Sequence, residues 1–248
     1  MELRTVASRL AEFCYPGSCE VCARSTRAPA MLCESCHADL AALQSAAACD
    51  RCGMPLFELD APCPYCTGKG VPHYERVIRL AVFDDPIKHL IHRLKYNGRW
   101  PLAEFLADRL VAHEPAKALL QETQVLVPIP LHPWRQIKRG YNQAELIARR
   151  IKKVCKIDIA QPLVRVRATE TQTHMHSHAK REENLRDAFA LDDARPVAGR
   201  HVTVIDDVMT TGATLQSAAR VLAKGKPASM SILVVAIADP KRRGFEVI

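Results

Sequence analysis

The chain has 248 residues, 35 Lys+Arg against 27 Asp+Glu for a formal charge of +8, and ten cysteines. Its 48% hydrophobic and 25% charged residues are typical of a globular protein and exclude disordered and collagen-like classes. No stretch approaches the roughly 18 continuous apolar residues that span a bilayer, and the charged N-terminus lacks the apolar run of a signal peptide. We therefore expect a cytoplasmic protein with no membrane insertion.

The cysteines are distributed very unevenly. Nine of the ten lie in residues 1–70, so we expect a small cysteine-rich domain over 1–70 and a larger domain over 71–248. Apolar residues at helical spacing within 3–13 predict a short helix before the cysteine pairs. Residues 1–70 carry six Lys+Arg and eight Asp+Glu, a net charge of −2, which leaves +10 on the larger domain.

Eight of the cysteines form four C-x-x-C pairs, and the first two pairs recur thirty residues later. Two C-x-x-C turns supply the four thiolates of a tetrahedral zinc site, and a reducing cytoplasm favours metal ligation over disulfides. A site with four thiolates is closed, so the two predicted zinc ions are structural. The spacing leaves sequential and interleaved pairing open. The predicted ligands are Cys19, Cys22, Cys33, Cys36, Cys49, Cys52, Cys63 and Cys66.

The larger domain alternates between strand and helix patterns. In chain order we expect strand 77–83, helix 87–96, helix 101–112, strand 124–129, helix 142–156, strand 163–167, strand 201–205, helix 214–223 and strand 231–238. This alternation predicts an α/β fold in which helices cover a mostly parallel sheet. Ligands of such sheets bind beyond the carboxyl ends of the strands.

The segment between the strand 201–205 and the following helix has the composition of a ligand site. Asp206 and Asp207 come first, and the run 210–214 of Thr, Thr, Gly, Ala and Thr leads into the helix. Small residues and a helix N-terminus suit a phosphate, whereas carboxylates accept hydrogen bonds from sugar hydroxyls or hold Mg²⁺. The order therefore indicates a phosphopentose. An acidic turn and a threonine helix cap explain single residues, but not the set.

These motifs resemble a known family. Residues 202–214 resemble the phosphoribosyl-pyrophosphate (PRPP) signature of type I phosphoribosyltransferases. Together with Val127-Pro-Ile-Pro-Leu-His-Pro133, Arg139-Gly-Tyr-Asn-Gln143 and the double zinc ribbon, they resemble the ComF/GntX family. The resemblance implies a type I phosphoribosyltransferase-like sheet behind an N-terminal double zinc ribbon. It also implies PRPP with Mg²⁺ as ligand, a link to the uptake or use of external DNA, and single-stranded DNA or DNA-uptake and helicase proteins as partners.

The same resemblance assigns roles to individual residues. Asp206 and Asp207 hold the ribose hydroxyls, and the turn with Pro128 and Ile129 is similar to the pyrophosphate loop of that fold. Lys95 and Arg139 are candidate diphosphate contacts, with solvated surface cations as the alternative. The implied 5′-phosphate cradle consists of Thr210, Thr211, Gly212, Ala213 and Thr214.

Two functions remain open at this point. One is a Mg²⁺-dependent phosphoribosyltransferase whose acceptor and catalytic residues are unassigned, and the other is a non-catalytic, PRPP-responsive module that docks on DNA-handling machinery through its zinc ribbons. The basic run 135–156 is either a nucleic-acid contact, a rim that steers an anionic ligand or, by base rate, a solvated helix face. The loop with His174, His176 and His178 is a metal-binding stretch, a lid or a solvated loop, and the last is favoured.

Overall fold

A computed structural model describes residues 17–27, 29–56, 63–66, 72–166 and 188–238. The helix expected within 3–13 and the loop with His174, His176 and His178 lie outside these residues, so both stay predictions. Within the described part of the chain, every helix is too short or too polar to span a bilayer.

The core of the molecule is a five-stranded sheet in which every pair is parallel, with the order β3-β9-β8-β4-β5. Its central strands are rich in Val, Ile and Leu and are buried on both faces, as a covered parallel sheet requires. The predicted α/β class with a mostly parallel sheet is confirmed. The strands are β3 (Val77–Val82), β4 (Val125–Pro128), β5 (Asp158–Ile159), β8 (His201–Met209) and β9 (Ser229–Ile237).

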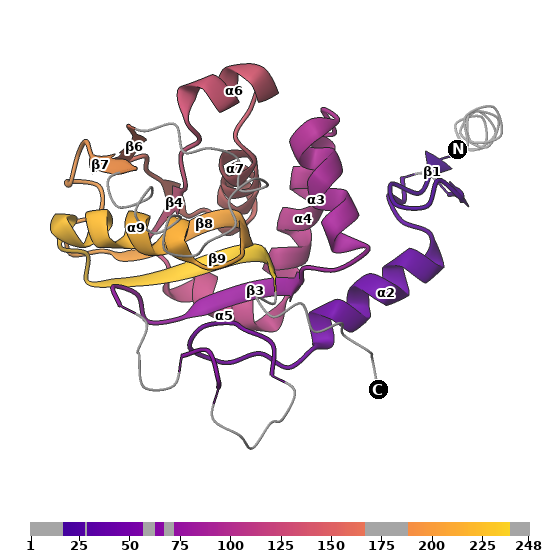
Figure 1. Ribbon diagram of the computed structural model, residues 1–248, viewed down its shortest axis with the longest axis horizontal. Helices are drawn as coiled ribbons and strands as arrows, with labels where there is room; N and C mark the ends of the chain where they lie inside the picture. The colour runs from indigo at the N-terminus through magenta and orange to yellow at the C-terminus, as the bar shows by residue number, and fades with distance from the viewer. Residues whose placement is uncertain (1–16, 28, 57–62, 67–71, 167–187, 239–248) are drawn as a thin grey trace, which may run out of the picture.

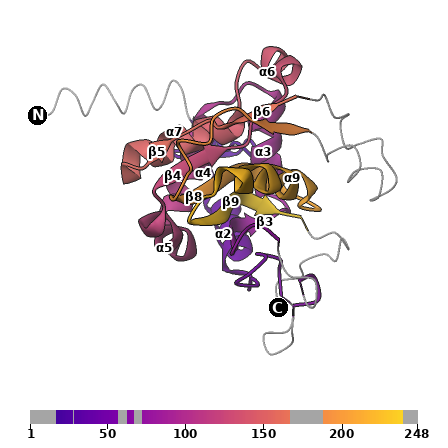
Figure 2. The same cartoon turned by 90° about the vertical axis from the view of Figure 1, so that its left-hand side faces the viewer.

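Helices cover both faces of this sheet, and the side chains of the central strands point alternately into two hydrophobic clusters (Figures 1 and 2). Ile205 and Leu233 pack under one layer, whereas Val204 and Val234 pack under the other. The first layer contains α3 (Ile87–Tyr96), α4 (Pro101–Ala112), α5 (Glu114–Glu122) and α7 (Gln143–Cys155). The second contains α9 (Ala213–Leu222), the 3₁₀ turn Ala223–Gly225 and the strands β6 (Leu163–Arg165) and β7 (Phe189–Leu191).

Most predicted elements are present, although several details differ and the short strands β1 (Gly17–Ser18), β2 (Ser25–Thr26), β5 and β7 are not predicted from the sequence. The strand expected at 163–167 exists as β6, but it pairs antiparallel with β7 in a separate two-stranded sheet. The strand expected to end at 205 continues to Met209. The helices α2 (Glu34–Ser45), α5 and α6 (Pro133–Arg139) were not predicted, and α6 buries none of its residues.

The cysteine-rich region packs beside β3, at the edge of the sheet (Figure 1). It contains the short strands β1 (Gly17–Ser18) and β2 (Ser25–Thr26) and the helix α2, whose Leu40 and Leu43 are buried in the first cluster. The backbone N–H of Val77 donates a hydrogen bond to the carbonyl oxygen of Arg51 at 3.0 Å. The expected boundary near residue 70 lies outside the described residues and stays a prediction.

One buried arginine fastens this region to the sheet. Arg79 of β3 is 3% exposed, and burial lowers its pKa to about 10. Its guanidinium donates hydrogen bonds to four backbone carbonyl oxygens, those of Ala46 at 2.8 Å, Gly53 at 2.9 Å, Ala47 at 3.1 Å and Leu43 at 3.5 Å. The planar guanidinium of an arginine can donate to several acceptors at once. This one side chain therefore holds the C-terminal end of α2 and the turn around Gly53 against β3.

Candidate functional site: two cysteine clusters and the loop after β8

The eight predicted cysteine ligands come together in two groups of four. In each group the sulfur atoms all lie within 4.8 Å of one another, and the groups follow the chain sequentially rather than interleaved. The Sγ–Sγ distances are 3.6 Å for Cys22–Cys33, 3.6 Å for Cys52–Cys63 and 3.7 Å for Cys49–Cys66. A zinc ion bound at about 2.3 Å from four sulfurs spaces them about 3.8 Å apart, so both groups are compatible with structural zinc.

The two groups are attached to different parts of the molecule. Cys19 and Cys36, of the first group, are buried in the cluster that also holds α3 and α4. Cys52, of the second group, is buried in the cluster on the other face of the sheet, with Val77 and Ile237. Each group of four cysteines therefore packs into a different hydrophobic cluster.

Glu20, between two ligands of the first group, is buried against α3. Its side chain is 7% exposed and forms ion pairs with Arg93, at 3.1 Å, and with Arg99. Arg93 also donates a hydrogen bond to the backbone carbonyl oxygen of Glu20 at 2.9 Å. A buried carboxylate held by two guanidinium groups is well compensated, because the charged hydrogen bonds offset its desolvation.

The loop after β8 forms a small, open hollow. Gly212 has φ of 77°, a left-handed conformation that glycine adopts without strain, and α9 begins at the next residue. The N-terminus of α9 therefore opens into the hollow, and the backbone N–H groups of its first turn suit an anion. The residues that line it are Asp206, Val208, Met209, Thr210, Thr211, Gly212, Ala213, Thr214 and Leu215. All five residues of the predicted phosphate cradle are among them.

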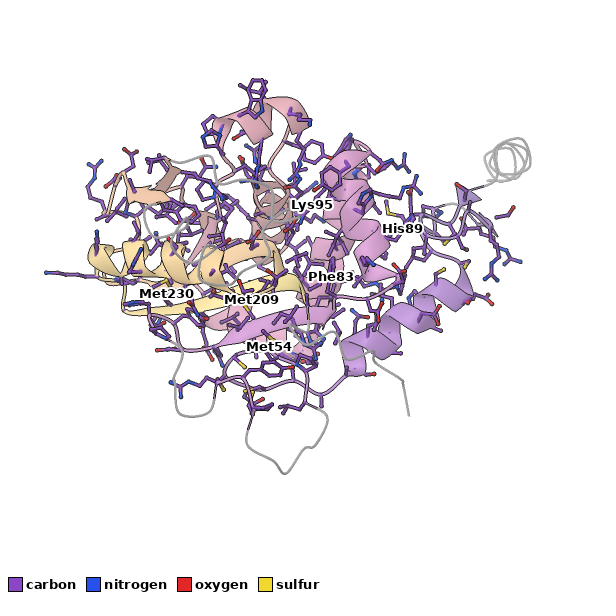
Figure 3. All side chains as sticks on the ribbon, viewed as in Figure 1. Met54, Phe83, His89, Lys95, Met209 and Met230 are labelled. Atoms are coloured by element: carbon purple, nitrogen blue, oxygen red, sulfur yellow. The ribbon has the colours of Figure 1, made fainter. Side chains whose placement is uncertain are left out.

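The two acids of the motif have different surroundings. Asp206 lines the hollow, whereas Asp207 is 7% exposed and is not among the lining residues. Oδ2 of Asp207 lies 2.8 Å from Nζ of Lys95, and among the described residues it has no other polar partner. Lys95 extends from the side of α3 that faces the sheet, with His89 on the opposite side (Figure 3). The backbone N–H of Asp207 donates a hydrogen bond to Oδ1 of Asp206 at 2.8 Å, which links the two acids.

Burial and the neighbouring Asp207 carboxylate raise the pKa of Asp206 to about 7, against the opposing effect of Lys95 and Arg165. A carboxyl group with a pKa near neutrality changes charge in the physiological range, which is a frequent property of functional sites. Sequence analysis missed Arg165. It lies in β6 with its guanidinium carbon 5.4 Å from the ring centre of Phe189, and a single arginine in a short strand carries no local signal of its role.

The remaining predicted contacts are not among the residues that line the hollow. Pro128 ends β4, and the carbonyl oxygen of Ile129 accepts a hydrogen bond from Asn142 at 2.9 Å. The guanidinium carbon of Arg139 lies 5.3 Å from the ring centre of Tyr96, the last residue of α3. The structure thus brings Lys95 to Asp207, and Arg139 to Tyr96 at the end of α3.

Fold and loop together define a protein with a phosphoribosyltransferase domain, and the family model described as "Phosphoribosyl transferase domain" matches residues 137–247. The DNA utilization protein YhgH of Escherichia coli K12 is 33% identical over 221 residues, which are 87% of this chain and 88% of that protein. Competence protein F of Haemophilus influenzae is 31% identical over 78% of this chain and 84% of its own length. Competence protein ComFC of Bacillus subtilis is 34% identical over 60% of this chain and 59% of its own. The chain belongs to this ComF/GntX family, as its motifs indicate.

Proposed function

We propose that this protein binds PRPP together with Mg²⁺ in the hollow after β8, and that it serves the uptake or use of external DNA. The observation that carries the proposal is that Asp206 and all five cradle residues line one hollow at the N-terminus of α9. The 5′-phosphate fits the N–H groups of the loop, and the ribose hydroxyls fit the carboxylates. The names of the relatives, DNA utilization protein and competence protein, support the link to DNA.

The donor set of this site fits magnesium. Asp206 is a carboxylate at the open hollow, and a hard cation that keeps part of its water shell needs few protein ligands. When bound, Mg²⁺ neutralises charge on the diphosphate. In a transfer reaction a nucleophile would attack C1 of PRPP, and the C1–O bond would break with its electron pair leaving on pyrophosphate. This chain would contribute positioning of the ribose and its phosphate. A module that binds PRPP without turnover uses the same contacts.

Calorimetry with PRPP and Mg²⁺ tests the site. We expect the double variant Asp206→Asn, Asp207→Asn to lose at least tenfold in affinity, because the acid at the hollow and the buried acid linked to it both lose their charge. The variant Asp39→Asn, which changes an exposed acid of α2, is the matched control and should bind like the native protein. Equal affinities in all three proteins would overturn the proposal. Release of pyrophosphate across a panel of bases and amines then separates the enzyme from the binding module.

A second function, binding of single-stranded DNA, is favoured by the surface formed by the end of α3 and by α6. Tyr96 is 64% exposed, Trp134 69% and Ile137 77%, although each is large and apolar. Arg139 lies against Tyr96, and among the described residues neither Lys138 nor Arg139 is paired with a carboxylate. Aromatic faces beside cations suit unpaired bases and their phosphates.

The basic residues of α7 have different surroundings. Arg149 pairs with Glu145, Arg150 with Asp108 at 2.7 Å, and Lys152 lies 3.7 Å from Asp158. This part of the basic run therefore has the character of a solvated, ion-paired helix face. Any contribution of the run 135–156 to DNA binding is expected from α6.

Fluorescence anisotropy with a labelled oligothymidylate tests this second function. We expect Trp134→Ala to weaken binding at least fivefold, since base stacking on an aromatic side chain contributes roughly 1–3 kcal/mol. Arg139→Ala should in addition reduce the slope of affinity against salt concentration. Val154→Ala and Lys153→Ala, on the exposed face of α7, are the controls. The same loss in Trp134→Ala and Val154→Ala would refute this surface.

A further inference from the structure

We infer that Glu20 is a positioning residue that couples the first four-cysteine site to the PRPP site through α3. This inference rests on the proposed function, because it concerns the geometry of the same carboxylates. Two sets of contacts lie on opposite sides of α3. One set holds α3 to the turn between Cys19 and Cys22, and the other holds α3 to the end of β8.

The helix itself separates the two sets of contacts. Arg93 and Lys95 are two positions apart, which places their side chains about 200° apart around the helix axis. Leu94 between them is fully buried, so the helix is fixed against the core. Arg93 therefore reaches the cysteine-rich region, and Lys95 reaches Asp207 from the other side.

On the side of the cysteines, the contacts are buried and converge on one carboxylate. Glu20 accepts from Arg93 within α3 and from Arg99 just beyond its end, so it holds the last turn of the helix from two points. The position of Glu20 depends on the turn that carries it, because its neighbours Cys19 and Cys22 are ligands of the first group. A small metal-binding turn has little core of its own and folds with its ion.

On the side of the proposed PRPP site, the contacts depend on the position of Lys95. Its ammonium group is the polar partner of Oδ2 of Asp207 among the described residues. Asp207 in turn donates its backbone N–H to Asp206, the acid at the hollow. Displacement of α3 would leave a buried carboxylate without its cation, which costs free energy and favours movement of that carboxylate.

The second four-cysteine group offers a built-in comparison. Asp50 occupies the position thirty residues after Glu20, between Cys49 and Cys52, but it is exposed. The second group packs against the opposite cluster, where it meets Val77 and Ile237 instead of α3. The repeat therefore supplies two zinc-ligand sets of equal chemistry, and within the described part of each set a buried acid that binds α3 is found in the first alone.

The experiment compares matched variants of the full-length, zinc-loaded protein by PRPP calorimetry with Mg²⁺. We expect Glu20→Gln to weaken PRPP binding on the order of fivefold or more, a typical size for coupling between two sites. Asp50→Asn should leave the affinity unchanged. Cys33→Ser and Cys63→Ser remove corresponding ligands from the first and second group, and the first should weaken binding more than the second. Equal affinities for Glu20→Gln and Asp50→Asn would overturn the inference.

A double-mutant cycle locates the coupling. If Glu20 acts through Lys95, then the losses of Glu20→Gln and Lys95→Met are not additive, and the double variant binds PRPP about as weakly as Lys95→Met alone. Additive losses would refute the route through α3. Hydrogen exchange of residues 87–96 provides a readout that does not need PRPP. Faster exchange in Glu20→Gln than in Asp50→Asn supports the coupling, and equal exchange contradicts it.

The two proposals fail in different ways. If the native protein does not bind PRPP at all, the proposed function fails, while exchange in α3 still decides whether the first cysteine site fixes this helix. If the native protein binds PRPP and all the variants of the cysteine-rich region bind equally well, the proposed function stands and the coupling fails.

Discussion

The side-chain N–H of Asn142 donates a hydrogen bond to the carbonyl oxygen of Ile129 at 2.9 Å, and its Oδ1 accepts one from the backbone N–H of Ala144 at 3.1 Å. One buried side chain thus begins α7 and also fixes the backbone that follows β4. The segment expected to act as the pyrophosphate loop is held in place by this residue.

Replacement of Asn142 should therefore cost stability. We expect Asn142→Ala to lower the free energy of unfolding by about 1–3 kcal/mol, because it removes a helix cap and leaves a buried carbonyl oxygen without its donor. Asn142→Asp keeps the cap but places a carboxylate against that oxygen, so it should also destabilise. Urea denaturation measures both. Asn97→Ala, at an exposed position after α3, is the control, and a loss of the same size there would contradict the explanation.

The titration of Asp206 predicts how PRPP binding depends on pH. Because the pKa of Asp206 is raised to about 7, the group is mostly neutral at pH 6 and mostly charged at pH 8. The charged form is the better acceptor for hydroxyls and Mg²⁺, so we expect its contribution to affinity to grow over this interval. The ratio of PRPP affinities between the native protein and Asp206→Asn isolates this carboxyl group from the titration of the ligand. A ratio that is constant from pH 6 to pH 8 would contradict the assignment.

The same shift predicts an effect on stability. A raised pKa means that the folded state holds the proton more tightly than the unfolded chain does, so this stabilising contribution is present below about pH 4 and is lost as pH rises through about 7. Asp206→Asn should therefore stabilise the protein at pH 8, and its advantage should shrink toward pH 5. Thermal unfolding at pH 5 and at pH 8 measures this difference. The control Asp39→Asn should change the melting temperature by the same amount at both pH values. An advantage independent of pH would be the contrary result.

Arg79 is expected to be the most sensitive single residue of the junction between the cysteine-rich region and the sheet. Arg79→Met leaves several buried carbonyl oxygens without a donor, so we expect a loss of about 3 kcal/mol or more. Arg79→Lys keeps the charge but reaches fewer acceptors, so its free energy of unfolding should lie between that of the native protein and that of Arg79→Met. Arg76→Met, which breaks an exposed ion pair with Glu122, should cost about 1 kcal/mol or less. Equal losses for Arg79→Met and Arg76→Met would contradict this role.

Metal analysis tests the cysteine clusters. We expect two zinc ions per chain in the native protein, and one in Cys33→Ser or in Cys63→Ser, because each group binds its own ion. Chelation should lower the melting temperature, since each group is packed into a hydrophobic cluster. Fewer than two zinc ions in the native protein would refute the assignment.

Local sequence patterns were sufficient for most of the sheet and for α3, α4, α7 and α9, because burial on one face leaves a period in the sequence. The helix α6 buries no residue and leaves no such period. The end of β8 was placed at 205 because two acids follow, yet pairing with β9 carries the strand to Met209. The backbone partner across the sheet decided this boundary, and local propensity did not.

In the candidate site, too, local sequence patterns predict the continuous segment but not the contacts between distant residues. The cradle 210–214 is one continuous segment, so its composition alone indicated a phosphate. Lys95 was expected at the diphosphate, but its pairing with Asp207 joins residues far apart in the chain and depends on how α3 packs. The role of Glu20 depends in addition on contacts between the cysteine-rich region and α3, and no spacing rule encodes them.

The position of the cysteine-rich region beside β3 has a consequence for how the chain can be divided. Within the described residues β3 has one strand neighbour, β9, and its other edge meets residues 46–53 through Val77 and Arg79. A protein shortened to 71–248 would present that edge, with unpaired N–H and C=O groups, to solvent. Such an edge is a template for pairing with another molecule. We therefore expect the larger domain on its own to associate through this edge more readily than the full chain does.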